Sequence, residues 1–490
     1  MKKWISVLVL VFLLTLVTSC KKDDDDDDNP DQITITYAGW NLGNIEDYNL
    51  ERRMIDAFME RYPNINVEIV ERPKIPDPTN PDSEIDMNWD EMLAAMAATG
   101  DLPDLYMYAT VPTAVINGWA HDMTDVMQDD PELANVSEDI ATGAVYNDKY
   151  FGIPQSNFYF GYFINRTLFE NANLDAPEFG VTWEDLLGFA QDVSTTPSDG
   201  TGIVGFSGVD RIFEWMPAQF DGSLGWFTYN DQGFHLDSTA FADSMEIMQG
   251  FYDENKGQYA EYVWETSSVS QKAEWYAEGE GTQFEKGRHA IMWDATWAWG
   301  WMLPNLIDEE EGLYNMDIDF IGTPVVVDGV QRIPVVLDYL VAGQGTEHPE
   351  EAYLLAKWLG FGKEGYLKRI EIATQFPEAG SVNFAPLQQD DELFDAYLGL
   401  FPAGTMTEYR KVLAHDSFII EGIKIVPGYA AARWNYQYGT YNGVSYTIAT
   451  MLDAIRGGTV NLSDVAVQLN ERVNAAHDEA WQALNNAMAN

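Results

Sequence analysis

The chain has 490 residues, 46% hydrophobic and 13% aromatic, so it can bury large cores and is not a disordered protein. Its length exceeds that of an ordinary single domain, which predicts two or more lobes. Asp and Glu number 79 against 27 Lys and Arg, and the resulting formal charge of -52 excludes most nucleic-acid binders.

The first twenty residues have the pattern of a bacterial export signal. Two lysines precede an apolar run from Trp4 to Val17, which is short for a membrane span. The run ends in Thr-Ser-Cys, which resembles a lipobox and predicts a lipoprotein signal peptide over 1–19 with lipidation of Cys20, the only cysteine. An uncleaved anchor is the alternative. Residues 20–32 contain six consecutive aspartates, which predict an extended acidic tether.

From Ile33 the sequence alternates predicted strands and helices. The first of these elements are strand 33–37, helix 50–62, strand 65–69, helix 89–99 and strand 104–109. A strand, a helix and a strand in this order favour a parallel sheet with helices on its faces. Pro73 to Asp82 holds four prolines without periodicity, which predicts an inserted loop.

A second series of elements follows, and it contains no internal repeat. Its predicted members are helix 111–117, strands 150–154 and 158–165, helices 166–173, 183–193 and 238–255, strands 289–293, 317–321 and 335–342, and helix 462–488. The absence of repeats disfavours an adhesive surface protein built from repeated units.

The motifs of metal and nucleophilic chemistry are missing. The six histidines never pair at ligand spacing on one predicted helix and there is no His-Glu-x-x-His, so no metal or other cofactor is predicted. The stretch 205–208 lacks the glycine spacing of a nucleophile elbow. With 79 acidic residues any two carboxylates fall close together by chance, so no catalytic residue is assigned.

Aromatic residues gather where three predicted strands end. These stretches are 37–41, 106–109 and 294–299. In open α/β sheets ligands bind outside the carboxyl ends of the strands. Aromatic faces suit the C–H faces of sugar rings, whereas Asn and Asp take the hydroxyls. Core packing is the alternative for any one of these aromatics.

Several stretches, taken in order, resemble the substrate-binding lipoproteins of ABC importers, in the family 1 class that includes the maltodextrin-binding protein. They are Gly-Asp-Leu-Pro-Asp at 100–104, Tyr-Phe-Gly-Ile-Pro at 150–154, 163–169, 182–186, Phe-Glu-Lys-Gly-Arg-His-Ala-Ile-Met at 284–292, and 348–352. The resemblance runs from about residue 33 to the end of the chain.

This resemblance implies an α/β, two-lobed periplasmic-binding-protein-like (type II) fold, with discontinuous lobes and a ligand cleft between them. Lobe one would contain residues 32–122 and 288–336, and lobe two 123–287 and 337–490. The implied function is non-catalytic: the protein captures a mono- or oligosaccharide and delivers it to ABC permease subunits. The implied location is the cell envelope, lipid-anchored on the outer face of the cytoplasmic membrane or in the periplasm.

Carried over from the family, the ligand-binding residues would come from both lobes. They are Trp40, Asn41, Tyr108, Phe158, Phe160, Asp294, Trp297, Asp338 and Tyr339, and a C-terminal contact could come from Tyr446 or Trp434. Two other readings stay open. An aromatic box with carboxylates also suits a cation such as a polyamine, and an extracellular glycosidase would use two of the acids.

Overall fold

The computed structural model describes most of the chain beyond the acidic tether. The described residues are 32–80, 83–197, 199–252, 259, 267–275, 284, 286–300, 302, 316–327 and 329–489. The predicted signal peptide, Cys20 and all of the tether except residue 32 lie outside them, as do residues 253–255 of the predicted helix 238–255.

A nine-stranded sheet runs through the described part of the chain in the order β2-β1-β5-β12-β8-β10-β9, with β11 also on β8 and β13 also on β12. The strands are β1 (Ile33–Ala38), β2 (Ile65–Ile69), β5 (Leu105–Tyr108), β8 (Ile153–Asn165), β9 (Val204–Phe206), β10 (His289–Ala295), β11 (Ile318–Phe320), β12 (Ile333–Ala342) and β13 (Phe418–Ile420). Strand β1 pairs in parallel with β2 and β5, which confirms the parallel opening expected from the sequence.

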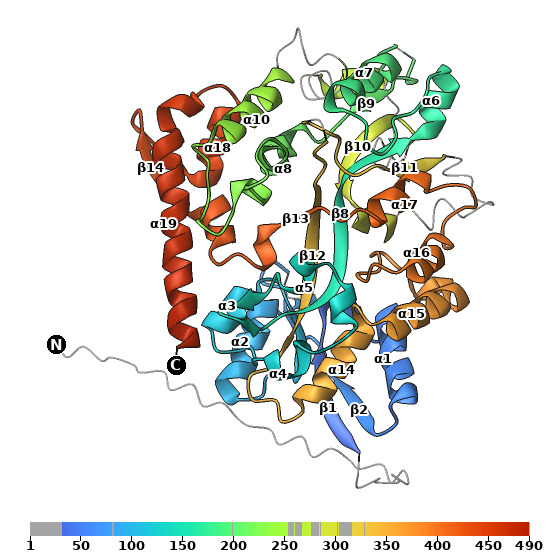
Figure 1. Cartoon of the computed structure of the whole chain (residues 1–490), viewed down its shortest axis with the longest axis vertical. Coiled ribbons are helices and arrows are strands. Elements are labelled where there is room, and N and C mark those ends of the chain that lie inside the picture. The colour runs from blue at the N-terminus through green and yellow to red at the C-terminus, as the bar shows by residue number, and fades with distance from the viewer. Residues whose placement is uncertain are drawn as a thin grey trace, which may run out of the picture.

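Strands β8 and β12 are long and connect the two ends of the molecule (Figure 1). The first half of β8 pairs with β12 and its second half pairs with β10. The sequence predicted two strands, at 150–154 and 158–165, but β8 is continuous from Ile153. The polar residues 155–157 interrupt the apolar pattern without ending the strand, because Ser156 and Asn157 still pair with β12 and only Gln155 falls at a shift of register.

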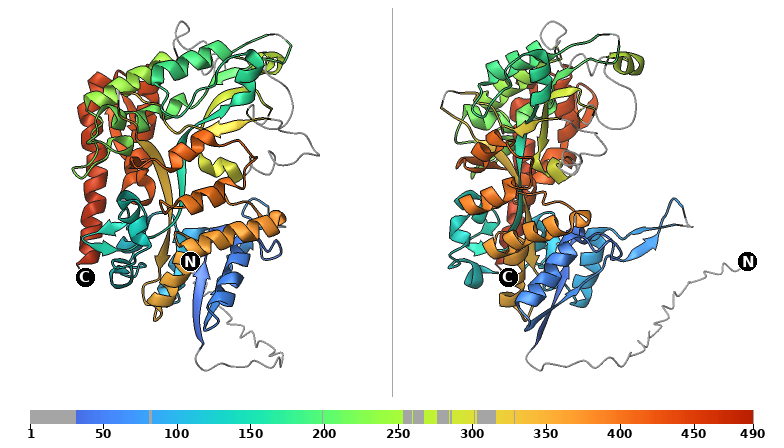
Figure 2. Two further views of the ribbon diagram at one scale, coloured as in Figure 1. Left: turned by 45° about the vertical axis from the view of Figure 1, so that its right-hand side comes forward. Right: turned by 90° about the vertical axis from the view of Figure 1, so that its right-hand side faces the viewer.

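Helices cover the sheet on both sides, as the two further views in Figure 2 show. The longer ones are α1 (Leu50–Arg61), α2 (Trp89–Thr99), α7 (Trp183–Val193), α10 (Thr239–Gly250), α14 (Pro349–Leu359), α15 (Lys363–Gln375), α16 (Asp391–Leu398), α18 (Ile448–Arg456) and α19 (Leu462–Met488). The shorter ones are α3 (Val111–Ile116), α4 (Thr124–Met127), α5 (Glu138–Ala141), α6 (Arg166–Ala172), α8 (Ile212–Trp215), α9 (Pro217–Phe220), α12 (Val269–Trp275) and α17 (Thr407–Leu413). Leu50, Met54 and Phe58 are buried on one face of α1, as their spacing predicted.

Three small hairpins lie outside the main sheet. They are β3 (Lys74–Pro76) with β4 (Glu84–Asp86), β6 (Val145–Tyr146) with β7 (Lys149–Tyr150), and β14 (Gln437–Tyr441) with β15 (Val444–Thr447). The Pro-rich segment was expected to be an irregular loop, and the β3–β4 hairpin corrects that expectation. Each of its strands has only three residues, so no period of two can be recognised in the sequence.

The buried residues form two clusters. The first gathers residues of β1, β2, β5, α1 and α14 to α17, and the second gathers residues of α7 to α10, β9, β10, α18 and most of α19. Residues 288–336, expected in lobe one, divide between the two clusters. Ala290 and Ile291 of β10 are buried in the second cluster, whereas Ile318 and Phe320 of β11 and the start of β12 are buried in the first. Helix α15, expected in lobe two, packs on α1 in the first cluster.

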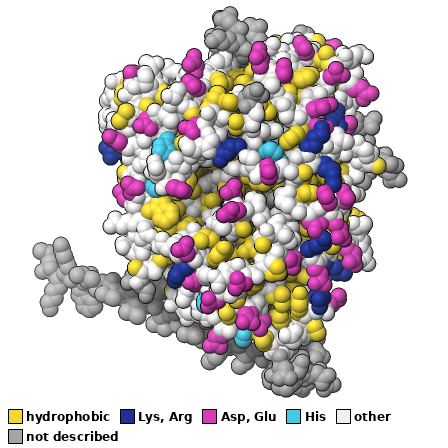
Figure 3. Space-filling model, in the orientation of Figure 1, with side chains coloured by type: hydrophobic (Ala, Val, Ile, Leu, Met, Phe, Trp, Pro, Cys, Tyr) yellow, Lys and Arg dark blue, Asp and Glu magenta, His cyan; other side chains and the backbone are white. Residues whose placement is uncertain are grey.

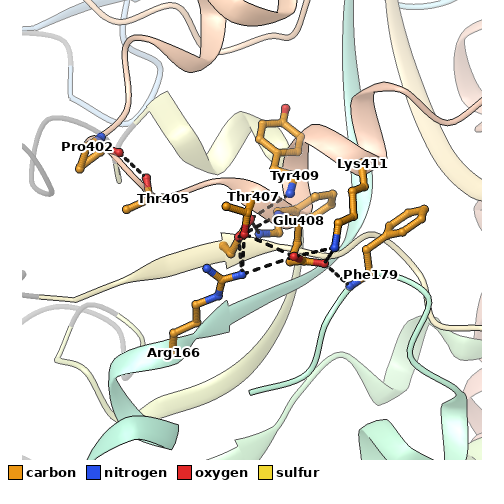
Figure 4. Close-up of polar contacts among 10 residues, drawn as sticks. Arg166, Phe179, Pro402, Thr405, Thr407, Glu408, Tyr409 and Lys411 are labelled. Atoms are coloured by element: carbon orange, nitrogen blue, oxygen red, sulfur yellow. Dashed lines mark hydrogen bonds and ion pairs between the residues drawn. The ribbon is translucent and has the colours of Figure 1, made fainter. Parts of the chain in front are cut away.

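Glu408 fastens α17 to a neighbouring part of the fold (Figure 4). Its carboxylate accepts a hydrogen bond from the backbone N–H of Phe179 at 2.8 Å and pairs with Lys411 at 2.7 Å. Arg166, the first residue of α6, lies 3.8 Å from Glu408 and donates to the hydroxyl of Thr407 at 3.1 Å. These contacts hold α17 against the start of α6 and the loop that follows α6.

Candidate functional site

A cavity of about 340 Å³ lies beside the middle of β8 and β12. Its wall comes from segments far apart in the sequence: the short helix η1 (Trp40–Leu42), the start of α1, the strands β5, β8 and β12, and the loop after α15. The lining residues are Trp40, Asn41, Asn49, Leu50, Glu51, Met107, Gln155, Ser156, Phe158, Asp338, Ala379, Gly380, Ser381, Asn383 and Phe384.

The loop that carries Trp40 and Asn41 is held firmly. It follows Gly39, where an added Cβ would lie 2.5 Å from the hydroxyl of Tyr37, so only glycine fits without a shift. Asn49 caps α1 by accepting from a backbone N–H, and its side-chain N–H donates to the carbonyl of Asn41 at 2.8 Å. The indole of Trp40 therefore stays partly exposed, at 36%, on a rigid support.

Asp338 and Lys424 form an ion pair at the cavity, with 2.9 Å between Nζ and Oδ1. Ser156 donates to the same carboxylate at 3.4 Å. The ammonium of Lys424 also lies 5.6 Å from the ring centroid of Trp40, within cation–π range. Lys424 follows β13, so this contact joins the η1 loop to β12 and to the segment after β13.

An aromatic cluster adjoins the cavity at Phe158. The ring of Trp297, 40% exposed, lies 5.7 Å from Phe158 and 5.2 Å from Phe160. Its Nε1–H donates to Asp294 at 3.0 Å. Burial raises the pKa of the Asp294 carboxyl, and the hydrogen bonds from the backbone of Ala295 and from Trp297 oppose that rise. The carboxylate orients the indole, and one aromatic surface continues from the cavity wall.

Both carboxylates on the cavity wall are already paired. Glu51 binds the buried guanidinium of Arg369, with 2.9 Å between Nη2 and Oε2 and a second contact through Nη1, while Asp338 pairs with Lys424. The strong negative charge of the chain is instead distributed over its surface, where Asp and Glu outnumber Lys and Arg on the face drawn in Figure 3. The cavity itself is therefore close to electrically neutral.

The structure brings four of the expected ligand-binding residues onto the cavity wall, namely Trp40, Asn41, Phe158 and Asp338. Phe160, Asp294 and Trp297 lie next to it, through the ring contacts with Phe158.

Tyr108 and Tyr339 do not line this cavity. They face each other across β5 and β12 and are 4% and 0% exposed. The two C-terminal candidates also lie elsewhere: Trp434 packs on Tyr429, and both Trp434 and Tyr446 border the second cluster.

Several cavity residues were not anticipated. Gln155 is 2% exposed, and no hydrogen bond to its Oε1 is present in the described part of the chain, so this oxygen can accept from a ligand hydroxyl. Ser156, Glu51 and Asn383 also line the cavity. The sequence signal for Gln155 and Ser156 was the polar run Gln-Ser-Asn inside an otherwise apolar strand. No local sequence pattern marked Glu51 or Asn383.

Among the described residues, no group of three or more His, Cys, Asp or Glu side chains is placed to hold a metal ion. None of the helices in the described ranges has both the length and the apolar composition needed to cross a membrane.

Solved structures share the fold at low sequence identity. A sugar transporter protein of Rhizobium etli, in an open conformation, aligns with a TM-score of 0.62 and 16% identity over 90% of this chain and 99% of its own. The cyclic α-maltosyl-1,6-maltose binding protein of Arthrobacter globiformis gives 0.61 and 15% over 91% and 100%. An ABC substrate-binding protein of Listeria monocytogenes in complex with cycloalternan gives 0.57 and 14% over 94% and 100%.

These matches establish the α/β, two-lobed solute-binding fold that the sequence analysis expected. A search of curated protein sequences found no significant match. The family model for the bacterial extracellular solute-binding protein, however, matches residues 43–361, which is more than half of the sequence. The chain therefore belongs to the family of bacterial extracellular solute-binding proteins.

Proposed function

We propose that this protein is the non-catalytic receptor of an ABC importer and binds a neutral saccharide in the cavity beside β8 and β12. One observation carries the proposal: an exposed indole, Trp40, stands over a wall whose two carboxylates, Glu51 and Asp338, are both neutralised by ion pairs. A sugar ring can lie on the indole, and its hydroxyls can bond to Asn41, Gln155 and the paired acids.

The two core clusters support a hinged, two-lobed molecule. We infer that one lobe comprises residues 32–122 with α14 and α15, and that the other comprises 160–291 with 419–476. Strands β8 and β12 would form the hinge, because β8 contributes buried residues to both clusters and β12 pairs with its first half. A ligand that contacts both lobes favours their closed arrangement, and a permease can recognise that arrangement.

The rival ligand and the rival activity fit the cavity less well. A polyamine requires unpaired negative charge, whereas the acids of the cavity already hold Arg369 and Lys424. A glycosidase requires one carboxyl as acid and another as base or nucleophile, and ion-paired carboxylates are poor candidates for the acid. Lipidation of Cys20 would hold the receptor at the cell envelope, with residues 20–32 as its tether.

The test is a thermal-shift screen of the mature chain against a broad saccharide panel, followed by calorimetry. One stacked ring contributes about 1 kcal/mol beyond area burial, so Trp40→Ala should raise the Kd by roughly a factor of five to ten. Tyr48→Ala is the matched control, because Tyr48 is an exposed aromatic nearby but outside the cavity.

The proposal requires that only the Trp40 variant lose affinity. A panel without any stabilising saccharide, together with salt-sensitive stabilisation by spermidine, would favour the cationic ligand. Turnover of a chromogenic glycoside would establish an enzyme instead.

A further inference from the structure

A second and larger cavity, of about 720 Å³, lies on the other side of the η1 loop. It is enclosed by that loop, by the end of β2, by the β3–β4 hairpin and by the start of α2. Trp40 lines both cavities. A single exposed indole therefore stands between two spaces, each of the size of a small-molecule binding site.

The walls of the second cavity are fixed by internal bonds. Arg52 is 4% exposed and donates to Glu71 at 2.7 and 2.8 Å and to the carbonyl of Leu42 at 3.0 Å, so it fastens the η1 loop to the end of β2. The cross-strand pair of Lys74 with Asp86, 2.6 Å apart, closes the hairpin. A cavity with walls held in this way loses little conformational entropy when a ligand enters.

The second cavity also extends the aromatic surface. The ring of Trp89 lies 5.8 Å from that of Trp40 at an interplanar angle of 74°, and its Nε1–H donates to the carbonyl of Met107 at 2.9 Å. Beside these rings stand groups that can bond to hydroxyls, including Asn44 and Asp47, which are hydrogen-bonded to each other at 3.2 Å. Aromatic rings next to hydroxyl-bonding groups repeat the chemistry of the first cavity.

Opposite charges on this wall nearly balance, which suits a neutral ligand. Glu71 is paired with Arg52 and Asp86 with Lys74, and Arg72 lines the same cavity as the two remaining carboxylates, Glu46 and Asp47. We propose that the ligand is a linear oligosaccharide that passes Trp40, with one end in the first cavity and its remaining units in the space formed by the β3–β4 hairpin. This inference rests on the proposed function and adds ligand length and a second subsite to it.

The experiment measures Kd by calorimetry for linear maltooligosaccharides and mannooligosaccharides of one to five units. Asn44→Trp places a bulky ring in the second cavity only, and Ile45→Trp is a second variant at the same wall. Val467→Trp, at an exposed position of α19, is the matched control for adding an indole to the surface.

In the wild-type protein we expect Kd to fall about tenfold between the shortest ligand that binds and a four-unit ligand, as one further stacked ring and its hydroxyl contacts would produce. The variants at 44 and 45 should keep the Kd of that shortest ligand within about twofold and lose the gain from added units. The control should behave as the wild type.

A Kd that does not depend on length, or a variant that weakens the shortest ligand as much as the longest, would overturn the second subsite and leave the proposed saccharide receptor intact. Absence of binding at every length in both series, and in the wider panel, would refute the saccharide ligand itself and this extension with it.

Discussion

The ion pair between Glu51 and Arg369 gives the sharpest stability prediction. The guanidinium of Arg369 is 1% exposed, and it binds both oxygens of Glu51, the carbonyl of Leu359 at 3.0 Å and the face of Phe384 at 5.0 Å. Glu51→Gln keeps the shape but removes the negative charge, so a buried cation is left without its counter-ion. Losing one partner of a buried pair costs about 3 to 5 kcal/mol, and we expect about 3 kcal/mol because the amide oxygen still accepts one hydrogen bond.

The double variant Glu51→Gln with Arg369→Met tests this reasoning, because it leaves no unpaired charge. It should be more stable than Glu51→Gln alone, although Arg369→Met also loses the hydrogen bond to Leu359. The measurement is the free energy of unfolding in urea, followed by far-ultraviolet circular dichroism for the wild type, both single variants and the double variant. Losses that simply add in the double variant would refute the claim that an uncompensated buried charge causes the destabilisation.

Three further predictions concern other charged groups. Asp319 is fully buried, accepts hydrogen bonds from two backbone N–H groups of α17 at 3.0 and 2.9 Å, and lies 2.7 Å from Arg166. Asp319→Asn should therefore lower the free energy of unfolding, measured in urea, by about 2 to 4 kcal/mol. A loss below about 0.5 kcal/mol would contradict its role as the anchor of α17. Burial raises the pKa of the Glu421 carboxyl to about 8, so the unfolded chain releases this proton at lower pH than the folded chain, and stability is lost as pH rises from about 5 to 8. Glu421→Gln should remove that loss, as measured by thermal unfolding at about pH 5, 6.5 and 8. Parallel pH profiles of the variant and the wild type would count against this role of Glu421. Lys424→Met leaves Asp338 without its cation, so spermidine at low salt should raise the melting temperature of this variant and not that of the wild type. Equal rises in both proteins would show that the ion pair does not exclude cations.

Local structure was largely predictable because it depends on neighbouring residues. The period of apolar residues predicted β1, β2 and α1 within one residue of their ends, and Gly100 ends α2 in the left-handed conformation that favours glycine. The polar tripeptide in β8 misled the same method. Burial on both faces removes the alternation by which a strand is recognised, so one long strand was read as two.

The candidate site was only partly predictable. Trp40 and Asn41 follow directly after β1, and the rule that ligands bind beyond strand ends located them. The same rule pointed to Tyr108, but the ring of Tyr108 packs edge-on against Tyr106 and Trp119 and is 4% exposed. A strand end marks a possible site, and only the residues packed on the faces of the sheet determine which side chains remain open.

The sequence by itself therefore determined the elements, the alternation of strand and helix, the excess of negative charge and the aromatic loops from which a binding site could be built. Only the tertiary structure decided the electrostatics of the cavity. Glu51 is neutralised by Arg369, 318 positions away, and Asp338 by Lys424 on the segment after another strand. The effect of a charge depends on its distance from its partner and on the water between them, and these distances are set by packing between segments that the local sequence pattern does not record.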